Sequence, residues 1–88
     1  MTVKHNPLMI NEDTKPSWDT DEYKFFVIDE DKNTLIANVY TKEPFKNDGY
    51  LIYKSGKPIS HLTSLEEACI KFDLCRLGLL DIKGGQDE

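Results

Sequence analysis

Aromatic and β-branched residues recur in short runs through the middle of the chain, with polar residues between them. Such runs are typical of strands. The polar residues 30–33 have turn chemistry, and 42–49 contains Pro44 and an Asn-Asp-Gly turn signal, so it is expected to be a loop. Pro58 at the start of the last run favours an edge position. The pattern predicts strands over residues 23–29, 34–41, 50–54 and 58–62.

Residues 63–80 have the apolar spacing of an amphipathic helix. Thr63 and Ser64 each precede a glutamate by three residues, which is the capping-box pattern, and the sequence does not choose between them. Gly78 is expected to end the helix.

These elements predict the α+β class. The expected fold is a small antiparallel sheet of three to four strands, a meander, packed on one C-terminal helix. Residues 1–20 show no sustained period and are expected to form an irregular N-terminal arm whose Trp18 touches the domain. Residues 21–80 would form a single domain, and 81–88 a polar tail.

The predicted helix has more apolar residues than one buried face needs. At about 100° per residue, three aliphatic side chains fall on the side opposite the expected core stripe. We call Ile70, Leu74 and Leu77 the outer stripe. The core stripe is predicted to contain Leu65, Ala68, Cys69, Phe72, Cys75 and Leu79.

The strands carry apolar residues on both faces, because side chains alternate along each strand and neither set is polar. One helix covers one face only. The N-terminal arm, a second copy or a different protein must therefore cover the other. The sheet residues expected at such a contact are Phe26, Ile28, Tyr40 and Tyr53.

Composition narrows the function further. The 88-residue chain is 39% hydrophobic and carries a net charge of −5, which argues against general phosphate-backbone binding and against an anionic membrane surface. No apolar run approaches the roughly 20 residues of a membrane span, and no signal peptide is evident at the N-terminus, so a cytoplasmic location is expected.

Catalytic chemistry is not indicated. Cys69 and Cys75 are expected to be free, buried thiols. His61 beside Ser60 makes no triad, since neighbouring strand residues point to opposite faces. The acidic stretches lack the spacing of a calcium loop. We therefore expect no enzyme activity, no cofactor, no metal and no small-molecule substrate.

The sequence favours a small interaction module that binds another protein or itself as a homodimer. Two alternatives stay open. The first is a nucleic-acid-binding module that uses the lysines and aromatic residues of Lys42–Lys57. The second is an acidic inhibitor of a DNA-binding protein, carried by a mobile element. Its acidic residues would be Asp19, Asp21, Glu22, Asp29, Glu30 and Asp31. The partner and the pathway are not identified.

Overall fold

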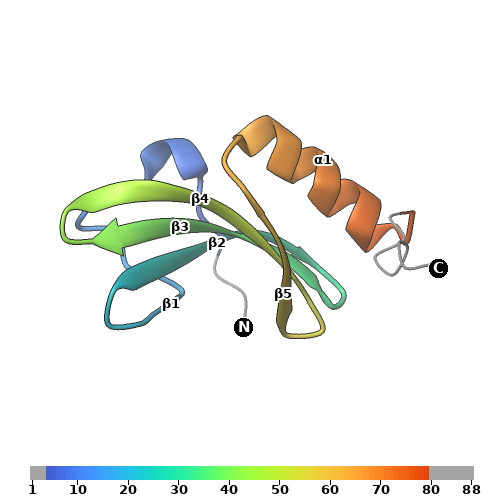
Figure 1. The fold of residues 1–88 in the computed structure, drawn as a ribbon, viewed down its shortest axis with the longest axis horizontal. Coiled ribbons are helices and arrows are strands. Elements are labelled where there is room, and N and C mark those ends of the chain that lie inside the picture. The colour runs from blue at the N-terminus through green and yellow to red at the C-terminus, as the bar shows by residue number, and fades with distance from the viewer. Residues whose placement is uncertain (1–3, 80–88) are drawn as a thin grey trace.

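The computed structural model describes residues 4–79. It shows a five-stranded antiparallel sheet in the order β1-β2-β3-β4-β5, with one C-terminal helix packed on one face (Figure 1). This confirms the α+β meander and its helix. The elements are a short 3-10 helix η1 (Pro7–Met9), β1 (Trp18–Asp19), β2 (Tyr23–Asp31), β3 (Thr34–Lys42), β4 (Phe45–Lys54), β5 (Lys57–Leu62) and α1 (Leu65–Arg76).

The predicted strand number of three to four was too low. The fifth strand, β1, lies in the arm that was predicted to be irregular, where Trp18 pairs with Phe25 of β2. The backbone N–H of Ser17 also donates to the carbonyl oxygen of Phe25 at 2.8 Å. A strand of two residues has no period to detect, so the sequence pattern gives no signal for it.

The predicted loop over 42–49 was too long, because β3 ends at Lys42 and β4 begins at Phe45, which leaves only a turn at 43–44. The Asn-Asp-Gly segment forms a β-bulge inside the strand instead of a turn. Tyr40 pairs with Asn47 and Asn38 pairs with Tyr50, so β4 has one residue more than β3 between these pairs. Gly49 adopts a φ of 101° in this bulge, a conformation that glycine accepts without steric cost.

The hydrophobic core lies between α1 and the sheet. Phe72 is 3% exposed and packs at its centre, as the helical pattern predicts. Two members of the predicted core stripe are exposed, Cys69 and Leu79. Leu79 leaves the stripe because α1 ends at Arg76, and Cys69 lies at the edge of the stripe. The buried residues of this core cluster are Ile36, Tyr50, Ile52, Ala68, Phe72 and Cys75.

The N-terminal arm follows the edge of β2 that faces away from β3, and its side chains contact both faces of the sheet. The backbone N–H of His5 donates to the carbonyl oxygen of Val27 at 2.7 Å, and the His5 ring meets Phe26 edge to face. Figure 1 shows η1 on the same side of the sheet as α1, whereas β1 lies at the sheet edge. Leu8 and Met9 of η1 are exposed. The arm therefore does not cover the second face with its apolar run.

The predicted polar tail, 81–88, lies outside the described residues. Among residues 4–79, no helix has both the length and the apolar character needed to span a membrane.

Candidate functional site

The outer stripe of α1 is exposed. Ser64 caps the helix, its hydroxyl accepting a hydrogen bond from the backbone N–H of Glu67 at 3.3 Å. In the helix that begins there, Phe72 lies on the side that packs against the sheet, and the outer stripe lies on the opposite side. Ile70, Leu74 and Leu77 are consequently 56%, 37% and 57% exposed. The helix thus has a buried apolar side and a second apolar side that no element within residues 4–79 covers.

A hollow of about 320 Å³ runs beside this stripe. Leu62 at the end of β5 forms one wall, and α1 forms the other with two aliphatic and two charged side chains. The lining residues are Leu62, Glu67, Ile70, Lys71 and Leu74. Leu62 also packs against the core cluster, so this wall of the hollow is held in place.

The four sheet residues predicted at a contact do not lie on one face. Phe26 is fully buried and Tyr40 is 9% exposed, and the two rings meet edge to face at 5.5 Å. Ile28 packs against the helix-side core. Tyr53 lies on the opposite, open face. Phe26 and Tyr40 are thus buried and Ile28 is half-buried on the helix side, so these three side chains do not form a contact surface.

The open face of the sheet has an aromatic hollow that the sequence reasoning missed. Its volume is about 480 Å³. Trp18 stacks on Phe25 with centroids 4.9 Å apart and meets Tyr53 edge to face at 5.7 Å. A tyrosine is neutral at physiological pH, and burial raises the pKa of the Tyr53 hydroxyl further. The lining residues are Trp18, Glu30, Asn33, Leu35, Tyr53, Ser55 and Gly56.

A β-bulge in β2 brings Glu30 to this hollow. Val27 pairs with Ala37, but Asp29, not Ile28, pairs with Ile36. The extra residue shifts the alternation, so Glu30 shares the face of Leu35 instead of the face of Phe26. A bulge leaves no clear mark in the apolar pattern, and simple alternation places Glu30 on the wrong face.

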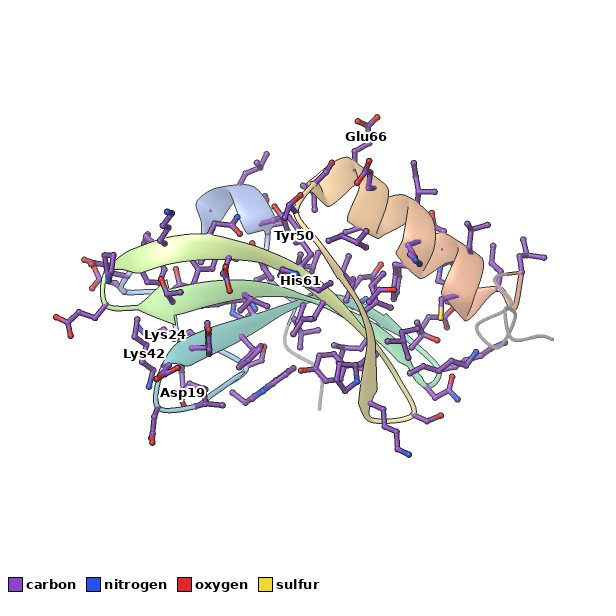
Figure 2. The ribbon with its side chains drawn as sticks, in the orientation of Figure 1. Asp19, Lys24, Lys42, Tyr50, His61 and Glu66 are labelled. Carbon is purple, nitrogen blue, oxygen red and sulfur yellow. The ribbon has the colours of Figure 1, made fainter. Side chains whose placement is uncertain are left out.

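The basic and aromatic residues of Lys42–Lys57 are not gathered into one platform. Lys42 forms an ion pair with Asp19, with 2.9 Å between Nζ and Oδ2, and Figure 2 shows both at one end of the sheet, away from Tyr50. Phe45 stacks on Tyr40. Tyr50 lies in the helix-side core, whereas Tyr53 lies on the open face. The geometry therefore gives a single-strand nucleic-acid platform no support.

The acidic residues near β2 are partly neutralised. Asp19, Asp29 and Asp31 each have a basic partner. These are Lys42 at 2.9 Å, Lys4 at 3.4 Å and Arg76 at 3.2 Å. An acidic mimic of DNA needs an array of unpaired negative charges. These three ion pairs reduce the unpaired negative charge near β2.

Both histidines contact backbone carbonyl groups. Nε2 of His61 lies 2.7 Å from the carbonyl oxygen of Asp48, and Nε2 of His5 lies 2.9 Å from that of Lys15. Within residues 4–79, no group of three or more His, Cys, Asp or Glu side chains is placed to hold a metal ion. These contacts give both histidines structural roles.

Comparison with protein-family models, with curated proteins and with solved structures gave no match to this chain. The function is therefore inferred from the geometry of two surfaces, the outer stripe on α1 and the aromatic hollow on the open face of the sheet.

Proposed function

We propose that this protein is a small, non-catalytic interaction module, and that its outer stripe binds a second copy of the chain. The observation that carries the proposal is the exposure of Ile70, Leu74 and Leu77 on a helix whose opposite side is already buried. Clustered exposed aliphatic groups on a small protein usually mark a contact with another chain. Two-fold self-association is the commonest form of such a contact.

Charge at the edge of the stripe favours a second copy over an unrelated partner. Glu67 and Lys71 are one helical turn apart, and both line the hollow beside Ile70 and Leu74. Two copies packed with their helices antiparallel would place each of these acids near the base of the other copy. A surface with this arrangement is complementary to itself.

The size of the stripe predicts a weak association. A two-fold contact buries the stripe of both copies, that is six side chains that are each about half exposed in the monomer, which supplies on the order of 5–9 kcal/mol. Association itself costs about 4–15 kcal/mol in lost freedom of motion. The two terms nearly cancel, so we expect a reversible dimer that forms at high protein concentration.

A cytoplasmic location belongs to the same proposal. Cys69 and Cys75 are both free thiols, which suits a reducing compartment.

Analytical ultracentrifugation of the wild type and two matched variants tests the proposal. Leu74→Lys places a charge in the outer stripe, and Leu8→Lys makes the same chemical change at an aliphatic residue that is 86% exposed on η1. We expect the wild type and Leu8→Lys to associate equally as concentration rises, and Leu74→Lys to stay monomeric. Circular dichroism serves as the folding control.

Two outcomes would contradict the proposal in different ways. A wild type that stays monomeric in a concentrated sample removes the second copy as the partner. Unfolding of Leu74→Lys would instead place Leu74 in the monomer core. Exchange of charge at the edge of the stripe tests the pairing of Glu67 with Lys71 of the other copy. Glu67→Lys should weaken association, and the double exchange Glu67→Lys with Lys71→Glu should restore it.

A further inference from the structure

The aromatic hollow on the open face has an ordered floor. Glu30 of β2, Leu35 of β3 and Tyr53 of β4 are direct cross-strand partners, so they form one row across three strands. Side chains in such a row stand about 5 Å apart on the same face of a sheet. A carboxylate, an aliphatic group and a phenol ring are therefore presented side by side.

The rim of the hollow is held by two turns. Asn33 of the β2–β3 turn donates from Nδ2 to the hydroxyl oxygen of Ser55 at 3.0 Å. The backbone N–H of Ser55 donates back to the carbonyl oxygen of Asn33 at 2.8 Å. These bonds fix the β4–β5 turn against the β2–β3 turn, so the rim is present without a ligand.

Trp18 and Tyr53 form two aromatic walls at nearly a right angle. Their ring planes differ by 82°, and Phe25 supports the indole ring from behind with planes only 8° apart. Trp18 is still 36% exposed, which is a large exposed aromatic area for a side chain so well supported. Two perpendicular ring faces define a corner rather than a flat stacking surface.

Glu30 adds a negative charge to this corner. The ion pairs within residues 4–79 use Asp19, Asp29, Asp31 and Asp73 and leave Glu30 without a basic partner. Glu30 is half-buried and lines the same hollow as the two rings. An acid near aromatic faces attracts a cation both by its charge and through the ring quadrupoles.

We propose that the hollow binds a methylated ammonium group, with Trp18 and Tyr53 as its aromatic walls, Leu35 as its floor and Glu30 as its counter-charge. A rounded cation with an apolar coat can touch both perpendicular rings and the aliphatic floor at once. A planar guanidinium can stack on only one of the two rings. The volume of about 480 Å³ lies in the range of small-ligand pockets. This surface is on the face opposite α1, so the inference does not depend on the proposed self-association.

Trp18 is the single tryptophan of the chain, so its indole N–H signal in a proton–nitrogen NMR spectrum reports on the hollow directly. Tetramethylammonium chloride is the first probe, with sodium chloride at equal ionic strength as the salt control and tert-butanol as the neutral control of similar shape. We expect a saturable shift of the indole signal with tetramethylammonium and none with the two controls. No saturable shift, or an equal shift with tert-butanol, would overturn the proposal.

Matched variants locate the charge. Glu30→Gln removes the carboxylate of the hollow, and Glu22→Gln makes the same change at an exposed acid just before the start of β2. Glu30→Gln should weaken binding about tenfold, because it removes the Coulomb attraction of a carboxylate in a partly desolvated site, while Glu22→Gln should bind like the wild type. Equal affinity in the two variants would contradict the role of Glu30.

Tyr53→Leu should also weaken binding about tenfold, because it removes one ring and keeps the reporter. If Tyr53→Leu does not fold, the comparison of Glu30→Gln with Glu22→Gln still decides.

Two further experiments compare classes of ligand. Tighter binding of arginine amide than of tetramethylammonium would overturn the shape argument. Choline and a trimethyllysine peptide then separate a small-molecule source from a protein-borne one by which binds more tightly.

Discussion

A Cβ atom on Gly49 would lie 2.7 Å from Nε2 of His61 and 2.7 Å from the carbonyl oxygen of Leu62. The first of these neighbours is a side-chain atom, but the second is backbone and cannot turn away. The bulge in β4 therefore approaches β5 so closely that glycine is required there. The same bulge returns Tyr50 and Ile52 to the helix side, where they complete the core.

Gly49→Ala should therefore destabilise the fold strongly. The positive φ of 101° alone costs roughly 1–3 kcal/mol for a residue with a side chain, and the contact with Leu62 adds to it. Gly56→Ala is the matched control, because Gly56 also has a positive φ of 81° but has nothing within 4 Å of the added Cβ. Urea unfolding of both variants measures the difference. Equal losses would show that β5 can shift to accommodate the methyl group.

Phe72→Ala should lower the free energy of unfolding by about 3–5 kcal/mol, because a large aromatic group leaves a cavity in the core. Phe72 is 3% exposed and lies in the core cluster with Ala68 and Cys75. Leu77→Ala at the C-cap of the same helix is the control, and the exposure of Leu77 predicts a change within about 0.5 kcal/mol. Thermal unfolding followed by circular dichroism distinguishes them. A small loss for Phe72→Ala would mean that α1 packs on the sheet with another face.

Ser64→Ala should lower stability by about 1 kcal/mol, the usual loss for a helix N-cap. The sequence left Thr63 and Ser64 as equal candidates, and the structure selects Ser64, whose hydroxyl accepts from the backbone N–H of Glu67. Thr63→Ala, at an exposed position, should have little effect. Urea unfolding of the two variants gives the comparison, and a larger loss for Thr63→Ala would place the helix start one residue earlier.

Alternation within the strands was predictable from the sequence, and so was the outer stripe of α1. Phe25 and Val27 do oppose Phe26, and Ile70 is exposed as the helical spacing indicates. Both results follow from regular periods of two and 3.6 residues. The sequence did not show which sheet face meets the helix, because both faces are apolar.

Features that depend on an interruption of the regular strand alternation, or on a strand too short to show one, could not be predicted. Glu30 reaches the open face only through the bulge between Val27 and Asp29. Trp18 reaches Tyr53 only because the two-residue strand β1 pairs with β2. In both cases a local irregularity is stabilised by contacts with residues distant in the sequence, and no pattern within a short window contains that information.

The two cysteines should react at very different rates with iodoacetamide. Cys69 is exposed, whereas Cys75 is 1% exposed in the core, so the native protein should take up one label quickly and the second only on unfolding.

Partial burial, with Asp73 and Asp29 nearby, raises the pKa of the Cys69 thiol. The reactive species is the thiolate, so the fast rate should continue to rise with pH beyond the range in which an unfolded cysteine has already levelled off. Mass spectrometry over a pH series measures this, with Cys69→Ser as the control that should remove the fast phase. A rate that levels off at the same pH in the folded and the unfolded protein would show that burial and the two acids do not hold the Cys69 thiol in its neutral form.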